Sequence, residues 1–305
     1  MIVFATSDKG GTGRSVTVSN VAYRRALDGI NVCYLDFDFG SPTAGAIFQL
    51  SDVARGVKKR PGTHTYLRGG ASDPIQCDIW KQTNRAELDR PRGAGRLVLL
   101  PGDEGGGEFA RLPGDAARCA TLLANLDDEF DLCIVDLSAG RSYATELVLE
   151  ALTDPALGQV GWRWLVFHRW TRQHIIAANG LVYGERGIID GGKTIGLDGA
   201  ALTNAIRFVR TAVVDPDSDQ LSGLRAAQVA WLRRCNRELQ ELAGRHHLGR
   251  TNLLGSIPLD PVLQWREQLI LDDDVYARQV ANRATIEAFI ALAGKLAEDA
   301  RWERL

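Results

Sequence analysis

The start of the chain places a glycine-rich loop between a short strand and a helix. Residues 2–6, Ile-Val-Phe-Ala-Thr, form an apolar run that is typical of a buried β-strand. From Ser15 onward, apolar residues recur at helical spacing, at Val18, Val21, Ala22 and Leu27. A strand that passes through such a loop into a helix predicts an α/β fold, with the loop at the carboxyl edge of a sheet.

This loop has the chemistry of an anion site. Gly10, Gly11 and Gly13 can adopt positive φ angles and let backbone N–H groups approach a phosphate without a Cβ in the way. The start of the helix adds a partial positive charge, and Ser15 is placed to bind a phosphate-bound Mg²⁺ through its hydroxyl. We interpret the segment as a nucleotide-binding loop; the alternative is a glycine-rich surface turn without a ligand.

The segment from Lys9 to Ser15, Lys-Gly-Gly-Thr-Gly-Arg-Ser, resembles the deviant Walker A loop, K-G-G-x-G-K-S/T, of the ParA/MinD family of positioning ATPases. The match departs from that pattern at Arg14, which replaces the usual lysine. The resemblance implies ATP and Mg²⁺ as ligands and a homodimer around two nucleotides, in which Lys9 reaches the partner's phosphates and takes part in catalysis. It implies nucleotide contacts from Lys9, Gly10, Gly11, Thr12, Gly13, Arg14, Ser15 and Val16.

Two aspartates follow the next apolar run, residues 32–35. Because carboxylates two residues apart at the end of a strand point the same way, Asp36 and Asp38 are directed toward the ligand crevice. The segment resembles the family's D-x-D segment, which implies that Asp36 helps to hold Mg²⁺ and that Asp38 orients the attacking water. A helix cap or a solvated acidic turn is the alternative.

A third segment ends another apolar run, residues 130–135, with Asp136. A carboxylate at a strand tip is typical of a Walker B strand, so Asp136 is a candidate for holding a Mg²⁺-bound water. The following Leu-Ser-Ala-Gly resembles the family's switch, in which the Gly140 N–H would sense a γ-phosphate; Ser138 replaces the usual proline. Since no cysteine follows this strand closely, an iron–sulfur relative is excluded.

Two later segments predict contacts with a nucleobase. Residues 199–204 are interpreted as a strand that ends in Asn204, whose amide can both donate to and accept from an adenine edge. Residues 253–260, Leu-Leu-Gly-Ser-Ile-Pro-Leu-Asp, resemble the family's L-G-x-I-P-x-D segment. That resemblance implies that Pro258 and Asp260 lie near the base.

Residues 221–250 read as a long helix and its exit, with a strong basic bias. A solvated helix face is one interpretation. The other is a docking surface for nonspecific DNA or an acidic partner, because ParA-type proteins use arginines late in the chain for DNA. The arginines of this segment are Arg225, Arg233, Arg234, Arg237, Arg245 and Arg250.

Overall composition gives little sign of a charged partner. The net charge of −2 exerts no global pull toward nucleic acid or anionic lipid. The chain runs from Met1 directly into a strand and has no run of 18 apolar residues, which predicts a cytoplasmic protein with reduced cysteines. Residues 295–305 balance basic and acidic side chains, and this argues against a basic amphipathic membrane anchor.

These segments predict one P-loop NTPase-like domain over residues 1–305, with insertions around 51–95 and 211–250. Its expected form is a three-layer α/β fold, a mostly parallel twisted sheet with helices on both faces. A surface turn at 191–193 and a closing helix from about Val275 are also expected.

The predicted function is a nucleotide-dependent dimerising switch with slow Mg²⁺-dependent hydrolysis that recruits or positions an unidentified partner. One alternative is a scaffold that binds nucleotide without hydrolysing it. Another is an ATP-dependent ligase or kinase, which would need an acid–base set that the middle of the sequence does not visibly supply.

Overall fold

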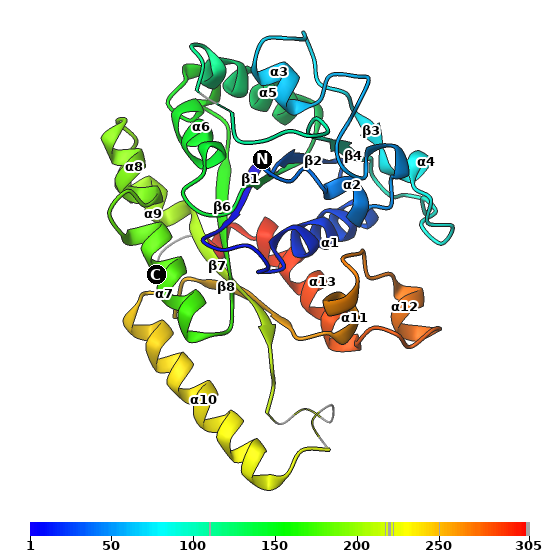
Figure 1. Cartoon of the computed structure of the whole chain (residues 1–305), viewed down its shortest axis with the longest axis vertical. Helices are drawn as coiled ribbons and strands as arrows, with labels where there is room; N and C mark the ends of the chain where they lie inside the picture. The colour runs from blue at the N-terminus through cyan, green and yellow to red at the C-terminus, as the bar shows by residue number, and fades with distance from the viewer. Residues whose placement is uncertain (110, 217, 219–220, 222, 250, 303–305) are drawn as a thin grey trace.

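The computed structural model describes residues 1–302 except 110, 217, 219, 220, 222 and 250. Its centre is an eight-stranded sheet with the order β3-β4-β2-β5-β1-β6-β7-β8 (Figure 1). The strands are β1 (Ile2–Ser7), β2 (Val32–Phe37), β3 (Cys77–Asp78), β4 (Leu97–Leu100), β5 (Leu132–Leu137), β6 (Trp162–Arg169), β7 (Ile206–Val213) and β8 (Leu253–Pro258). Neighbouring strands are parallel except that β3 is antiparallel to β4.

The register of the parallel strands brings the predicted site segments to one edge. Asp36 of β2 is paired with Asp136 of β5, and Asp136 is also level with Ala5 of β1. Since these three strands run in the same direction, the segments that follow them leave the sheet side by side. The central position of β1 therefore places its loop between the acidic ends of β2 and β5 on one side and β6 on the other.

Helices cover both faces of the sheet because alternate strand residues point to opposite sides. Val3 and Ala5 pack in a core with α1 (Arg14–Leu27) and α13 (Arg283–Ala297). Ile2 and Phe4 pack in a second core on the opposite face, which is covered by α5 (Asp115–Glu129), α6 (Tyr143–Ala151) and α7 (Arg172–Tyr183). This arrangement confirms the predicted three-layer α/β architecture.

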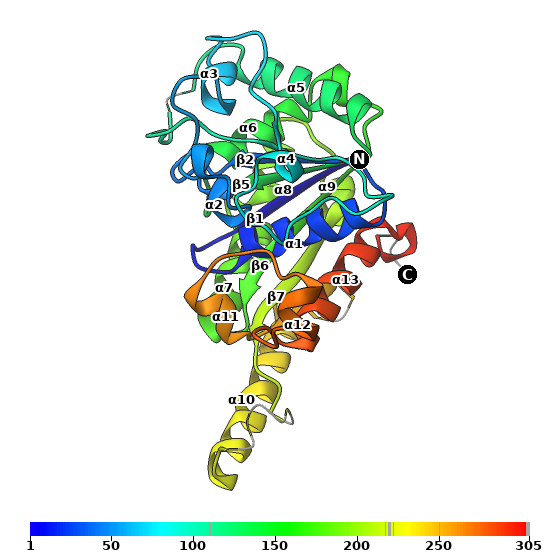
Figure 2. The ribbon, with the colours of Figure 1, turned by 90° about the vertical axis from the view of Figure 1, so that its right-hand side faces the viewer.

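Residues 51–95 wind along the β4 edge of the sheet and contribute β3. Helix α10 (Ala226–Arg245) extends away from the sheet in both views (Figures 1 and 2), and its buried residues are Leu242 and Ala243, near its end. The remaining short elements are α2 (Ala44–Ile47), η1 (Ser51–Val53), α3 (Thr63–Leu67), α4 (Ile79–Gln82), η2 (Pro155–Leu157), α8 (Ile188–Thr194), α9 (Gly199–Ala205), α11 (Pro261–Trp265), α12 (Asp272–Tyr276) and η4 (Asp299–Arg301).

Three predicted elements are wrong. Residues 199–204 belong to helix α9, because Asp198 caps it by accepting the Ala200 N–H at 2.9 Å. The expected surface turn at 191–193 lies inside helix α8. The closing helix is two helices, α12 and α13, since the chain between them includes Gln279 at a positive φ of 54°.

Three further expectations concern membrane spans, the basic helix and the cysteines. No helix in the described ranges is both long enough and apolar enough to span a bilayer. The predicted basic helix begins at Ala226 and ends at Arg245, while Arg250 lies outside the described residues. Four cysteines are buried and Cys235 is partly exposed; all five are free thiols, as expected.

Candidate functional site

The loop between β1 and α1 is open and depends on glycine. Gly11 and Gly13 have φ angles of 69° and 73°, in the left-handed region that other residues rarely adopt. A Cβ built at Gly10, Gly11 or Gly13 would meet no heavy atom within 4 Å, so the loop backbone faces free space. Gly13 is also the N-cap of α1, which places this space at the amino end of a 14-residue helix.

A cavity of about 210 Å³ lies beside the loop. It brings the loop together with the end of β8 and the segment that follows it, which include Pro258 and Asp260. Val16 also lines this cavity, as do three residues that sequence reasoning did not select, Thr211, Gln264 and Glu267. The structure therefore joins the predicted phosphate loop to the predicted nucleobase segment.

Asp260 lines the cavity, but its carboxylate is occupied by the fold. It is only 1% exposed, and its two oxygens accept from the Val262 N–H at 3.1 Å, the Asn282 N–H at 2.9 Å and the Thr285 hydroxyl at 2.7 Å. These bonds start α11 and join the end of β8 to the beginning of α13. Asp260 thus shapes the wall of the cavity rather than presenting a free carboxylate to it.

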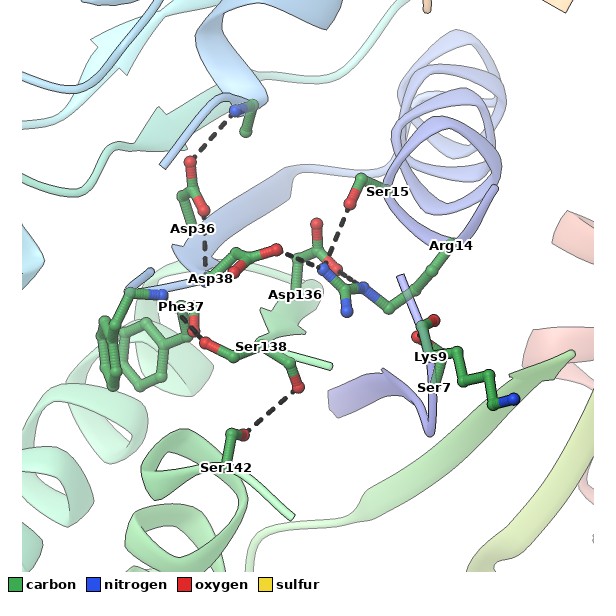
Figure 3. Close-up of polar contacts among 12 residues, drawn as sticks. Ser7, Lys9, Arg14, Ser15, Asp36, Phe37, Asp38, Asp136, Ser138 and Ser142 are labelled. Carbon is green, nitrogen blue, oxygen red and sulfur yellow. Dashed lines mark hydrogen bonds and ion pairs between the residues drawn. The ribbon is translucent and has the colours of Figure 1, made fainter. Parts of the chain in front are cut away.

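Arg14 lies at the centre of the polar cluster next to the loop (Figure 3). Its Nε donates to Asp136 Oδ1, and its Nη2 donates to Asp38 Oδ2 at 2.9 Å and to Ser15 Oγ at 3.3 Å. The second oxygen of Asp136 accepts from the Tyr34 hydroxyl at 2.7 Å. The guanidinium that was expected at the phosphates therefore bridges the two aspartates.

The contact of Arg14 with Asp136 is buried, whereas its contact with Asp38 is partly exposed. The side chains of Arg14 and Asp136 are 6% and 2% exposed, whereas that of Asp38 is 27% exposed. Burial alone would lower the pKa of Arg14, but the charges of Asp136 and Asp38 raise it above its usual value. Burial and the charge of Asp136 also raise the pKa of Tyr34 well above its usual range, so Tyr34 stays a hydrogen-bond donor.

Asp36 is turned away from this cluster (Figure 3). Its oxygens accept from the backbone N–H groups of Asp38 at 3.2 Å and Ala44 at 3.0 Å, which fixes the turn after β2. Burial, together with the nearby charge of Asp136, raises the pKa of Asp36 well above its usual range. The structure gives Asp36 the role of a buried structural carboxyl.

The switch segment after β5 is tied to its neighbours. The Gly140 N–H donates to Ser7 O at 2.7 Å, and Gly140 has a φ of 79° that favours glycine. The Ser138 hydroxyl accepts from the Phe39 N–H at 3.0 Å and donates to Phe37 O at 3.2 Å. The serine that replaces the family's proline thus connects the ends of β5 and β2 through its side chain.

Lys9 points away from Arg14 and the aspartates (Figure 3). It is exposed, and it makes no ion pair with any residue that the structure describes. Its charge acts on the partly buried His174, whose pKa is lowered first by burial and then by the charge of Lys9. Lys9 is therefore available to a group outside its own loop.

Asn204 does not lie in the site, and this corrects the sequence-based assignment. It is exposed in α9, directly before β7 begins, so it lies at the amino edge of the parallel sheet, opposite the loop. At the carboxyl end of β7 stands Thr211, whose hydroxyl donates to Thr12 O. A threonine at a strand tip is a weak signal by sequence alone, because it has equally good packing roles there.

The comparisons with known proteins concern the fold and part of the sequence. No protein-family model matches the chain. The septum site-determining protein MinD of Synechocystis is 30% identical over 139 residues, which cover 46% of this chain and 45% of that protein. The matched region thus spans about half the length of each of the two proteins.

Solved structures match the whole fold at lower sequence identity. MinD in the MinC:MinD cell division complex of Aquifex aeolicus has a TM-score of 0.58 at 17% identity, over 97% of this chain and 94% of that one. MinD of Pyrococcus horikoshii complexed with Mg-ADP has a TM-score of 0.52 at 16% identity, over 98% and 96%. A ParA family ATPase from Chlorobium tepidum has a TM-score of 0.54 at 13% identity, over 96% and 98%. The chain is therefore related in sequence to MinD over 46% of its length and has the fold of the MinD and ParA ATPases over nearly all of it.

Proposed function

We propose that this protein binds ATP at the loop between β1 and α1 and works as a dimerising switch that recruits or positions a partner. The observation that carries this proposal is the continuity of the open loop with the cavity of about 210 Å³ beside it. A nucleotide needs an anion site joined to a pocket for its nucleoside, and both are present on adjoining segments.

The phosphates would bind at the amino end of α1. Helix amino ends carry unpaired N–H groups and a partial positive charge, and the glycines of this loop leave its backbone accessible. The nucleoside would occupy the neighbouring cavity, between Thr211 and Pro258. That MinD of Pyrococcus horikoshii is complexed with Mg-ADP supports a nucleotide as the ligand class.

Magnesium fits the present side chains less well than the sequence predicts. Of the three predicted ligands, Asp36 is bonded to backbone N–H groups, both oxygens of Asp136 are already bonded, and the Ser15 hydroxyl accepts from Arg14 at 3.3 Å. Within the described residues, no cluster of three or more His, Cys, Asp or Glu side chains could hold a metal ion. The site supports nucleotide binding more directly than it supports a metal.

Slow hydrolysis is part of the proposal, and one contact favours a protein that does not hydrolyse at all. Asp38, which the resemblance assigns to orienting water, has one oxygen bonded to Arg14 at 2.9 Å. A carboxylate oxygen that accepts from a guanidinium is less free to orient water. A nucleotide-sensing scaffold is therefore the second candidate, and phosphate release under saturating ATP distinguishes it from a slow ATPase.

Calorimetry with ATP and ADP on the full chain tests the proposed site. We expect saturable binding of one nucleotide per chain, and we expect Gly13→Val to abolish it, because the φ of 73° is strained for a β-branched residue. Gly93→Val is the matched control, since Gly93 has a φ of 89° in a distant turn. Absence of binding by the wild-type protein at millimolar ATP and ADP, with and without Mg²⁺, would refute the proposal.

The remaining proposals concern organisation and partners. Residues 1–305 would form one nucleotide-binding domain, with insertions around 51–95, which includes the edge strand β3, and around 211–250, which includes the end of β7 and helix α10. Helix α10 would be a docking surface, because Arg225, Arg233, Arg234 and Arg237 are all exposed on or next to it. Nonspecific DNA is the partner that this basic surface suits best.

A further inference from the structure

We propose that the Arg14 guanidinium takes the place of the divalent cation in this site, so that the protein binds its nucleotide independently of Mg²⁺. The inference rests on the proposed nucleotide site and specifies which cation supplies the positive charge in it. Three properties of Arg14 support it: the atoms that its side chain contacts, the burial of these contacts, and the planar shape of its guanidinium.

Of the four side chains predicted to hold or serve the metal, Asp136, Asp38 and Ser15 are bonded to Arg14, while Asp36 is bonded to backbone N–H groups. Nε binds Asp136 Oδ1, while Nη2 binds Asp38 Oδ2 at 2.9 Å and lies 3.3 Å from Ser15 Oγ. The other oxygen of Asp136 is held by the Tyr34 hydroxyl at 2.7 Å. A cation entering between these groups would have to break the contacts of the guanidinium with both aspartates (Figure 3).

Burial opposes the replacement of the Arg14 guanidinium by a metal ion. The Arg14 side chain is 6% exposed and that of Asp136 is 2% exposed, so separating them would leave a charge in a poorly hydrated place. A hydrated Mg²⁺ also gives up its waters reluctantly and requires near-octahedral oxygen ligands. The Arg14 guanidinium is held by the fold, whereas a metal ion would have to displace it.

The geometry explains why arginine suits this position. Its planar group presents separate nitrogens to two carboxylates from different segments, Asp136 in β5 and Asp38 directly after β2. A lysine has one compact ammonium group, which cannot bridge the two aspartates in this way. The remaining nitrogen, Nη1, has no hydrogen-bond partner among the described residues and can donate to an anion held by the loop.

The test compares the dissociation constant for ADP, measured by calorimetry, in excess Mg²⁺ and in EDTA. For the wild-type protein we expect the two constants to agree within about twofold. In Arg14→Lys we expect Mg²⁺ to tighten binding by at least about tenfold, because the freed carboxylates can then serve a metal. Arg24→Lys is the matched control, since Arg24 is a buried, ion-paired arginine on the same helix, and it should behave like the wild type.

Ser15→Ala gives a second readout that does not disturb the buried ion pair. If Ser15 held a metal, loss of its hydroxyl would weaken ADP binding in Mg²⁺ but not in EDTA. We expect instead the same small change in ADP affinity under the two conditions. Circular dichroism establishes that each variant is folded, and the wild-type comparison is informative even if Arg14→Lys does not fold.

The outcomes separate this inference from the proposed function. Wild-type binding that is at least tenfold tighter in Mg²⁺ than in EDTA would overturn the role given to Arg14 and leave the nucleotide site intact. A selective loss of Mg²⁺-supported binding in Ser15→Ala would overturn it as well. Failure of the wild type to bind any nucleotide under either condition would refute the proposed function, and the role of Arg14 with it.

Discussion

At the scale of single residues, the two carboxylates that share Arg14 differ in burial and should differ in their contribution to stability. Replacing Asp136, which is 2% exposed, with asparagine removes the partner of a buried guanidinium. We expect Asp136→Asn to lower the free energy of unfolding by about 3 kcal/mol. Asp38 is 27% exposed, and we expect Asp38→Asn to cost about 1 kcal/mol or less.

Urea denaturation of both variants measures this difference under identical conditions. The two substitutions make the same chemical change on partners of the same arginine, so each is a control for the other. Equal losses of stability would contradict the view that Asp136 is the main counter-ion of Arg14.

His168 offers a pH-dependent prediction within the core. It is 1% exposed, and burial lowers its pKa to about 4, so it is neutral in the folded protein. The unfolded chain takes up this proton near pH 6.5, so stability from the neutral histidine is present above pH 6.5 and is lost as the pH falls toward 4. Between pH 7 and pH 5, this one group should lower the free energy of unfolding by about 2 kcal/mol.

Urea unfolding of His168→Leu at the two pH values checks this expectation. The decrease between pH 7 and pH 5 should be smaller than in the wild type by about 2 kcal/mol. His246→Leu, at a partly exposed histidine, is the control and should follow the wild type. A pH dependence in His168→Leu that equals the wild-type one would show that His168 titrates normally in the fold.

At the scale of elements, periodicity predicted long buried segments well and short helices poorly. The apolar strands β1, β2 and β5 lie within one or two residues of their predicted bounds, because both faces of a central parallel strand are buried. Helix α9 was misread as a strand because seven residues with three alanines carry no clear period, and its Asp198 cap was the decisive signal. That error misplaced Asn204.

Contacts between elements that are distant in sequence limit how much of the site can be predicted from the sequence. The sequence identified Arg14, Asp38 and Asp136 as members of one site, but the direction of a long side chain depends on what surrounds it after folding. Arg14 and Asp136 are 122 residues apart, and their pairing follows from the order of β1, β5 and β2 in the sheet. No local sequence pattern shows whether Arg14 contacts the carboxylates or a bound phosphate.

Helix α10 allows a prediction about nucleic acid. Arg234 and Arg237 are exposed on a helix that extends away from the sheet, and reversing their charges should remove phosphate contacts. We expect Arg234→Glu with Arg237→Glu to weaken nonspecific DNA binding by at least about tenfold at 50 mM salt. Filter binding over a range of salt concentrations measures the change.

A control for this experiment lies on another exposed helix surface. Arg283 is 74% exposed at the start of α13, so Arg283→Glu makes the same Arg-to-Glu reversal at one position away from α10. We expect it to retain DNA binding within about threefold. If the wild-type protein does not bind DNA at low salt with nucleotide present, α10 has another partner.

At the scale of the whole molecule, the position of Lys9 allows a prediction about assembly. Lys9 is exposed at the carboxyl edge of the sheet and points away from its own acidic cluster (Figure 3), so its ammonium is free to reach phosphates held by a second copy. We expect ATP to raise the mass of the wild-type protein from monomer to dimer. Lys9→Ala should bind ATP within about threefold of the wild type yet stay monomeric, because it loses a charge that acts between copies rather than within one.

Size-exclusion chromatography with light scattering, with and without ATP, measures this dimerisation directly. Lys59→Ala removes an exposed lysine from the β4 side of the molecule and should dimerise like the wild type. A Lys9→Ala protein that still dimerises with ATP would place the dimer contact elsewhere. Loss of both ATP binding and dimerisation in that variant would mean that Lys9 serves the phosphates of its own chain, which requires the loop to turn inward from the conformation described here.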